Sequence, residues 1–120
     1  MPKLVVLITS HVETGHPIAE AWERAGATGV TFIESYGLRR FNEASRAFEV
    51  LPGMMSMLQI LRENDQGSLC LLSVVEDDPV VERLIAAAQS VLGDLSAPDT
   101  GILFVLDIAR VLGIRQRRAR

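Results

Sequence analysis

The strongest constraint on the fold is a strand–helix–strand pattern that occurs twice along the chain. Residues 3–10, KLVVLITS, form a short apolar run rich in β-branched side chains, and residues 68–75, SLCLLSVV, form a second one. Each run precedes a helix-like segment and then another apolar run, at 30–36 and at 102–111. Short apolar runs of this kind predict buried strands. The resulting order, strand–helix–strand–strand–helix–strand, predicts the ferredoxin-like βαββαβ fold of the α+β class.

In this fold an antiparallel four-stranded sheet carries two helices on one face, with the first and third strands at its centre. The runs 3–10 and 68–75 are the ones expected at the centre, and both are almost uniformly apolar. A chain of 120 residues is long enough for one core and short for two. We therefore predict a single domain spanning 1–120, with a long loop at 37–67.

Both predicted helices have recognisable ends. Pro17 suits the first position of a helix, and Gly26 suits the position after the last. Asp77 and Asp78 precede the second helix as caps, and Pro79 begins it. The positions expected to face the sheet are Ile18, Ala21, Trp22 and Ala25 in the first helix, and Val81, Leu84, Ile85, Ala88 and Leu92 in the second, which ends at Gly93.

The last predicted strand is apolar on both faces, with Phe104, Leu106 and Ile108 on one and Val105, Ala109 and Val111 on the other. Two helices cover only one face of the sheet, so a monomer would expose the other to water. This predicts an oligomer. Asp107 and Arg110 interrupt the strand on opposite faces, which favours ion pairs across strands or subunits over a pair between the two.

Composition argues against several classes of function. The net charge of −3 does not mark a nucleic-acid-binding protein, and the central runs lack the aromatic residues on which RNA-recognition modules stack bases. No apolar segment is long enough to span a membrane and no export signal is visible, so we expect no membrane insertion and a cytoplasmic location. The single cysteine, Cys70, lies in an apolar run, where a core role is the common one.

Few residues suggest catalysis or metal binding. His11, Glu13 and His16 crowd the turn after the first strand, but their spacing matches no closed zinc pattern. We expect neither a metal site nor a catalytic role. A small enzyme that gathers Glu34 and Tyr36 around these histidines stays open as an alternative.

Three segments are candidates for binding. The loop 93–101, GDLSAPDTG, could present backbone N–H groups to a phosphate. The C-terminal tail carries Arg115, Arg117, Arg118 and Arg120. The connection 37–67 has the length of a functional loop, and it includes Met54, Met57, Leu58 and Leu61, which would share a helical face. That face either packs on its own subunit or contacts a partner protein.

Three sequence segments resemble PII-type signal-transduction proteins. TGILFVLDIARVLGIR at 100–115 is similar to the family's DGKIFVFDVARVIRIR, GATGVTFIESYG at 26–37 to GITGMTVTEVKG, and AAAQS at 86–90 to TAQT. The resemblance covers nearly the whole chain except 39–67. It implies a non-enzymatic homotrimer that takes part in nitrogen regulation. Such a protein binds ATP or ADP, often with 2-oxoglutarate, between subunits and acts on targets through its long loop.

The resemblance also implies ligand-binding residues. These are Thr31 in the adenine pocket, Gly37, Arg39 and Arg40 at the base of the long loop, Gly101 before the last strand, and Arg115 as a phosphate ligand. Ile102 and Gly113 stand where the family has a phosphate-binding lysine and a second arginine, and Arg39-Arg40-Phe41 replaces its glycine-x-glutamine pattern.

Losing two cations weakens charge-assisted binding of a triphosphate. The effector is therefore ATP, ADP, another adenine nucleotide, or a different small ligand. A trimeric metal-binding protein of the copper-tolerance type and an amino-acid-sensing domain share the architecture and stay open as alternatives.

Overall fold

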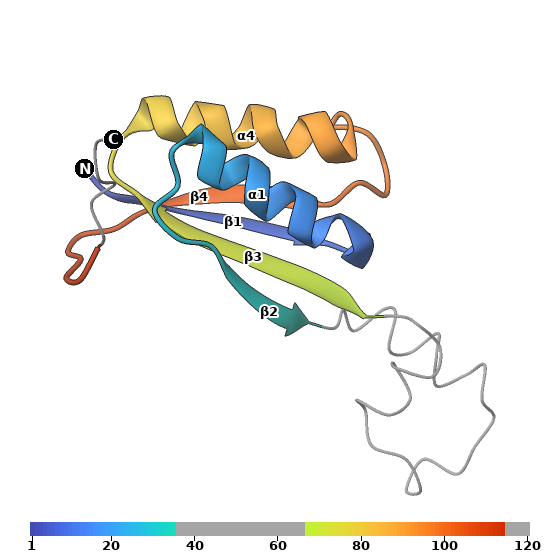
Figure 1. The fold of residues 1–120 in the computed structure, drawn as a ribbon, viewed down its shortest axis with the longest axis horizontal. Coiled ribbons are helices and arrows are strands. Elements are labelled where there is room, and N and C mark those ends of the chain that lie inside the picture. The colour runs from blue at the N-terminus through green and yellow to red at the C-terminus, as the bar shows by residue number, and fades with distance from the viewer. Residues whose placement is uncertain (36–66, 115–120) are drawn as a thin grey trace, which may run out of the picture.

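The computed structural model describes residues 1–35 and 67–114, which form one antiparallel sheet with both helices on one of its faces (Figure 1). The strands are β1 (Lys3–Thr9), β2 (Thr31–Ser35), β3 (Ser68–Val75) and β4 (Ile102–Asp107), in the spatial order β2-β3-β1-β4. The most apolar runs are therefore central, and the predicted ferredoxin-like α+β fold is confirmed. The predicted loop at 37–67, with its methionine-rich helical face, lies outside the described residues up to position 66.

The helices begin and end close to the predicted residues. A single 3-10 turn, η1 (Val12–Thr14), leads into α1 (Gly15–Ala25), and α4 (Asp78–Leu92) follows β3. The Asp77 side chain accepts a hydrogen bond from the Val80 N–H at 3.1 Å, which confirms it as the N-cap. The helix α1 begins two residues before Pro17. Proline is tolerated there because the N–H groups of a first helical turn have no intrahelical acceptor.

The core lies between the two helices and one face of the sheet. Trp22 is fully buried at its centre, and its indole N–H donates to the Leu84 carbonyl at 3.0 Å, which joins α1 to α4. The other core residues are Val5, Leu7, Ile18, Ala19, Ala27, Leu71, Val75, Val81, Leu84 and Ala88. In α1 the buried alanine is Ala19, whereas the sequence predicted Ala21. No helix within the described residues has both the length and the apolarity to cross a bilayer.

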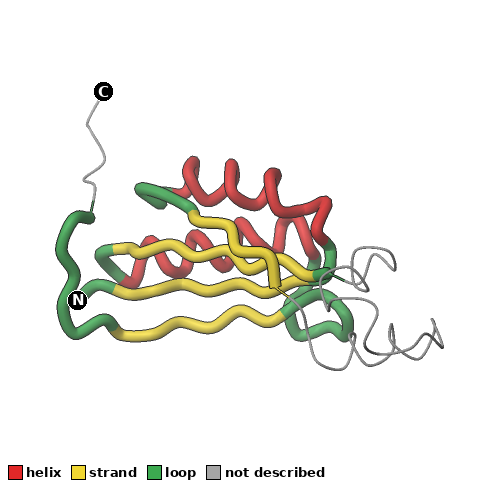
Figure 2. Tube along the Cα trace, turned by 90° about the horizontal axis from the view of Figure 1, so that it is seen from below, coloured by secondary structure: helices red, strands yellow, loops and turns green. Residues whose placement is uncertain are grey.

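The strand β4 is shorter than predicted. It pairs with β1 as far as Asp107, and the Ile108 N–H adds one bond to the Pro2 carbonyl at 3.0 Å. Pro2 has no N–H with which to return the bond, so the ladder of paired hydrogen bonds is broken there. The chain then leaves the sheet, and Figure 2 shows it turning across the strand ends beside the N-terminus. The predicted alternation is therefore confirmed for 104–106, and the prediction that the strand continues to 111 is wrong.

The second face of the sheet, here the helix-free face, is almost entirely apolar. The strand registers place on it Leu4, Val6 and Ile8 of β1, Cys70, Leu72 and Val74 of β3, Thr31 and Ile33 of β2, and Ile102, Phe104 and Leu106 of β4. Within one chain Ile33 and Leu106 are 48 % and 49 % exposed. A contiguous apolar surface of this kind is typical of an interaction site.

On the helix-covered side, Lys3 joins three elements. Its ammonium group donates to the Asp107 carboxylate across the β1–β4 pair and lies 3.7 Å from a carboxylate oxygen of Asp78 at the start of α4. The predicted cross-strand ion pair of Asp107 is thus confirmed. The hydrogen bond to Asp107, aided by both carboxylate charges and opposed by partial burial, raises the pKa of Lys3 above its ordinary 10.5.

We expect deprotonation of Lys3 to break this ion pair and so to lower the stability of the protein at alkaline pH. A raised pKa means that its contribution is complete below about pH 10.5 and is lost as the pH rises through the folded-state pKa. Lys3→Met keeps the apolar stem and removes the charge. The urea midpoint of the variant should therefore decline less steeply than that of the wild type from about pH 9 to about pH 12.

Arg24→Met is the matched control, because within residues 1–35 and 67–114 the Arg24 side chain has one ion-pair contact, a long one of 4.0 Å to Glu20 on the outer face of α1. Arginine keeps its proton over this pH range, so the control should follow the wild-type curve. Parallel curves for Lys3→Met and the wild type would contradict the assignment.

Candidate functional site

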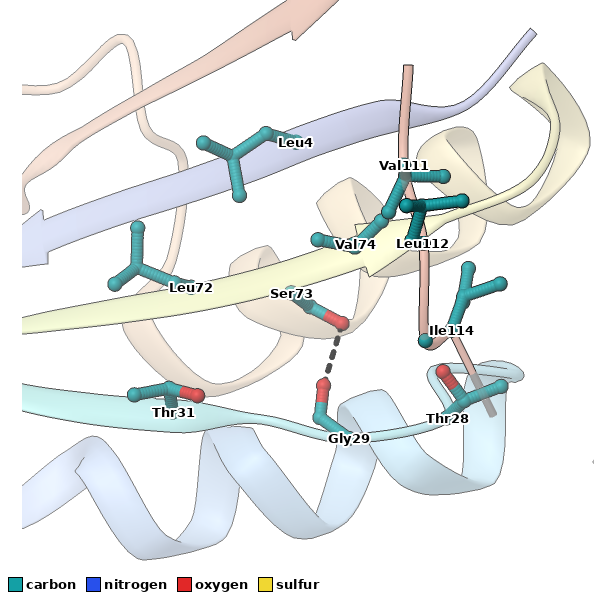
Figure 3. A pocket seen from close by; sticks show the side chains of 11 residues that line it. Leu4, Thr28, Gly29, Thr31, Leu72, Ser73, Val74, Val111, Leu112 and Ile114 are labelled. Carbon is teal, nitrogen blue, oxygen red and sulfur yellow. Dashed lines mark hydrogen bonds between the residues drawn. The ribbon is translucent and has the colours of Figure 1, made fainter. Parts of the chain in front are cut away.

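A cavity of about 350 Å³ lies on the helix-free face, where the segment after β4 crosses the sheet (Figure 3). One wall is the start of β2 with two residues that precede it, Thr28 and Gly29, and the floor is formed by Leu4, Leu72 and Val74. Residues 111–114 form the opposite wall. The volume lies at the lower end of the range of about 300–1,000 Å³ that small-molecule sites occupy.

The position of Thr31 follows from the strand pairing. Thr31 begins β2 opposite Leu72, and this register turns its side chain to the helix-free face and into the cavity wall. Before it, the Ser73 hydroxyl donates to the Gly29 carbonyl at 2.7 Å, the dashed contact in Figure 3. This bond fixes the start of β2 against β3. A predicted ligand residue thus lines a real cavity.

The described cavity lining contains no charged side chain. Its polar side chains are those of Thr28 and Thr31, and Ser73, whose hydroxyl is bonded to the Gly29 carbonyl, contributes backbone to the lining. Such a lining suits a flat, uncharged ring system that needs hydrogen bonds at its edge, and it cannot by itself neutralise a phosphate. Cations for a phosphate must come from elsewhere in the chain or from another copy.

Lysine cannot be the source of that charge. Lys3 is the only lysine in the sequence, and its ammonium group is bound to Asp107 on the helix-covered side. Ile102, which replaces the expected lysine, lies at the far end of β4 from Asp107 and is 57 % exposed. The remaining cations are arginines. Arg115 directly follows Ile114, which lines the cavity, but it lies outside the described residues, as do Gly37, Arg39 and Arg40.

Gly113, which stands where the resemblance expects an arginine, also adopts a backbone conformation that favours glycine. Its φ is +85°, in the left-handed region where a side chain is disfavoured, and it lines the cavity. The turn that brings residues 111–114 over the sheet therefore needs a glycine where the resemblance expects an arginine. Sequence reasoning missed this wall because it extended the last strand to position 111. Gly113, two residues after the run 102–111, was the available signal for a turn.

Gly101 lies at the other edge of the sheet. It precedes β4, whereas Thr31 begins β2, and three strand spacings of about 4.8 Å, or about 14 Å in all, separate these edge strands. Its φ is +144°, and a Cβ atom there would lie 2.8 Å from the Ile8 carbonyl oxygen. The structure thus explains Gly101 by backbone geometry and does not bring it beside Thr31 within one chain.

Most N–H groups in the first half of loop 93–101 are already bonded within the chain. The N–H groups of Gly93 and Leu95 donate to the backbone and side-chain oxygens of Gln89, at 2.8 and 3.1 Å. Those of Ser96 and Ala97 donate to the side-chain and backbone oxygens of Asp94, both at 2.9 Å. These four groups are not available to a phosphate, so the predicted cradle would have to use other N–H groups of the loop, chiefly those at its end.

The two histidines have separate partners. The His11 Nε2 atom lies 2.6 Å from the Asp99 carbonyl oxygen, and the His16 Nε2 atom lies 2.7 Å from a Glu20 carboxylate oxygen. Across residues 1–35 and 67–114, no three His, Cys, Asp or Glu side chains are grouped in a way that could hold a metal ion. The copper-tolerance alternative thus has no support from this part of the chain.

Comparison with known proteins decides the family. The family model of nitrogen regulatory protein P-II matches residues 2–118. The chain belongs to this family. P-II proteins are regulatory signal-transduction proteins. Among solved structures the chain is similar to B. subtilis GlnK, with 18% identity over 90% of this chain and 85% of that one, and a TM-score of 0.56.

A second structure, the B. subtilis GlnK–ATP complex, gives a TM-score of 0.57 at 18% identity, over 90% of this chain and 82% of that one. At this level of identity both likenesses support the P-II fold. No curated protein sequence matches the chain.

We expect Gly101→Ala to lower stability by about 1–3 kcal/mol, because the left-handed backbone is strained and the new methyl group meets the Ile8 carbonyl. Gly29→Ala is the matched control, since nothing lies within 4 Å of the place that its new methyl group would take and its φ lies outside the left-handed region. Urea denaturation followed by circular dichroism should separate the two variants. Equal stabilities would show that the close approach of Gly101 to β1 is unimportant.

Proposed function

We propose that this P-II protein is a homotrimeric regulator that binds an adenine nucleotide between subunits and acts on a target protein through residues 37–67. We place its action in the cytoplasm. The observation that carries the proposal is the cavity beside Thr31. It lies where the family resemblance expects an adenine pocket, and it is a ring-sized space with threonine hydroxyls in its wall.

In the proposed site the two ends of the nucleotide meet different copies of the chain. Thr31 lines the cavity on one copy and contacts the base, and Arg115 of the same copy reaches the phosphates. Gly101 lies about 14 Å of sheet width from Thr31 within one chain, and we propose that it reaches the ligand from a second copy. Gly37, Arg39 and Arg40 stand at the mouth of the cleft, at the base of the long loop.

The helix-free face supports the trimer. Burial of apolar surface is worth about 25 cal/mol per Å², and this face leaves large side chains such as Ile33, Ile102 and Leu106 roughly half exposed in one chain. Threefold packing of these faces removes them from water. It also places the edge of one sheet next to that of its neighbour, where the ligand is proposed to bind.

The uncharged lining favours a second candidate, a small-ligand sensor that does not bind nucleotides. Ile102 and Gly113 replace two cationic phosphate ligands, so in a nucleotide site the base carries a larger share of the affinity than the phosphates do. On this basis the affinities for ATP, ADP and AMP should lie closer together than in a site with three cations, where each charge-assisted bond adds about 1.5–3 kcal/mol.

We expect ATP, ADP or AMP to raise the melting temperature of the wild-type protein, because a ligand that binds only the native state stabilises it. Thr31→Val keeps the shape of the side chain and removes its hydroxyl. It should weaken nucleotide binding in calorimetry by about fivefold, the loss of one hydrogen bond of about 1 kcal/mol.

Thr28→Val is a second hydroxyl deletion in the same cavity wall and tests whether the position of Thr31 matters. Arg115→Gln should weaken ATP binding more than AMP binding. If none of the three nucleotides changes the melting temperature, the nucleotide proposal fails and the small-ligand sensor becomes the better interpretation.

Assembly can be tested separately. The wild-type protein should elute in light-scattering chromatography with three times the 13.1 kDa chain mass, and Leu106→Glu should give the monomer mass. Val12→Glu is the matched control, because Val12 is 47% exposed but lies on η1, away from the helix-free face. A monomeric wild-type protein at micromolar concentration would overturn the trimer.

A further inference from the structure

The end of loop 93–101 is held by side chains at the end of β1. We propose that Thr9 and His11 form a clamp that sets the backbone of Asp99–Gly101, and that they are therefore positioning residues for this edge of the sheet. The clamp itself stands on hydrogen bonds within the described chain. Its effect on ligand binding rests on the proposed function.

Thr9 is the buried half of the clamp. Its side chain is almost fully buried, and its hydroxyl donates to the Thr100 carbonyl at 2.9 Å. The same oxygen accepts a hydrogen bond from the His11 N–H at 3.1 Å. One hydroxyl thus ties the loop to β1 and also fixes the backbone from which the His11 ring extends.

His11 is the outer half. Its Nε2 atom lies 2.6 Å from the Asp99 carbonyl oxygen, which can only accept, so Nε2 carries the proton. The His11 carbonyl accepts from both the N–H and the hydroxyl of Thr14, at 2.9 and 2.6 Å. The ring therefore projects from a backbone that is held on both sides. Its Nδ1 atom faces the Glu13 carboxylate at 3.7 Å.

The segment that the clamp holds is strained. Within residues 1–35 and 67–114, Asp99 is the one non-glycine residue with a positive φ, at +63°. Such a backbone persists only where surrounding contacts over-determine it. The contacts to β1 are the bonds to the carbonyls of Asp99 and Thr100, with Gly101 packed directly on the Ile8 carbonyl. Within the loop the Thr100 hydroxyl adds a bond to the Ala97 carbonyl at 2.9 Å.

The clamp also sets the direction of two donors. The C=O and N–H of a trans peptide point in opposite directions. Turning the carbonyls of Asp99 and Thr100 toward β1 therefore directs the N–H groups of Thr100 and Gly101 away from it. These two groups belong to the part of the loop whose N–H groups are not used by Gln89 or Asp94.

The test is amide hydrogen exchange on the full-length protein, read by mass spectrometry. His11→Ala should speed exchange at the end of the loop by about tenfold, read at Ile102, which pairs with Ile8 in the β1–β4 ladder, and leave the centres of β1 and β3 unchanged. His11→Gln retains a side-chain N–H donor and should restore part of the protection. His16→Ala is the matched control, because His16 pairs with Glu20 on α1 and does not touch the loop.

The location of the faster exchange distinguishes a loop clamp from a general loss of stability. A clamp predicts faster exchange confined to the loop, with little change in melting temperature. Unchanged exchange in His11→Ala, or faster exchange spread evenly over the sheet, would overturn the proposal. If His11→Ala does not fold, Thr9→Val decides, because it keeps the buried shape and removes the hydroxyl that bonds to Thr100. Loop exchange at the wild-type rate in that variant would also overturn the clamp.

Nucleotide binding gives the second readout. If Gly101 faces the ligand as proposed, His11→Ala should weaken ATP binding by about fivefold, and His11→Gln should weaken it less. Faster loop exchange with unchanged ATP affinity would leave the clamp standing and remove Gly101 from the ligand site. Absence of ATP binding in the wild type would count against the proposed function, while the exchange result would still decide the clamp.

Discussion

Packing of α1 and α4 against one face of the central strands is the interaction on which the other features of this protein depend. Trp22 joins the two helices through the Leu84 carbonyl, and Val5, Leu7 and Leu71 are buried beneath them. Side chains alternate between the two faces of a strand, so burial of these residues also fixes the residues between them. Leu4 and Leu72 must then face the helix-free side, where they form the cavity floor.

Local sequence patterns were sufficient to predict most of this arrangement. The apolar runs, the helical stripes and the Asp77 cap depend on neighbours in the sequence, and the helices begin and end within two residues of the prediction. The end of β4 depends instead on the strand beside it, because Pro2 accepts the last hydrogen bond and has no N–H to donate in return. An apolar run cannot show where its neighbour stops. For the same reason the strand was predicted to continue to position 111, where the cavity wall begins.

The candidate site also contains residues that could be predicted from the sequence and residues that could not. The family resemblance pointed to Thr31 and Gly101, and the structure places one in a cavity wall and the other against the Ile8 carbonyl. Their separation across the sheet could be predicted from strand order alone. The roles of Thr9 and His11 could not, because both contacts join residues about 90 positions apart. A threonine and a histidine at the end of a strand carry no such signal.

The separation of the two half-sites links assembly to binding. In the proposed arrangement Thr31 and Gly101 contact one ligand from two copies. A ligand that binds only the assembled form stabilises assembly by the free energy of its binding. In the proposed trimer, assembly buries the apolar helix-free face whether or not ligand is bound, and the ligand adds to that driving force. The ligand's own effect is then felt most at the edges of the sheet, where the clamp and the base of the 37–67 loop lie. In the proposed trimer the ligand therefore acts at the sheet edges, and the core between the helices and the sheet lies apart from it.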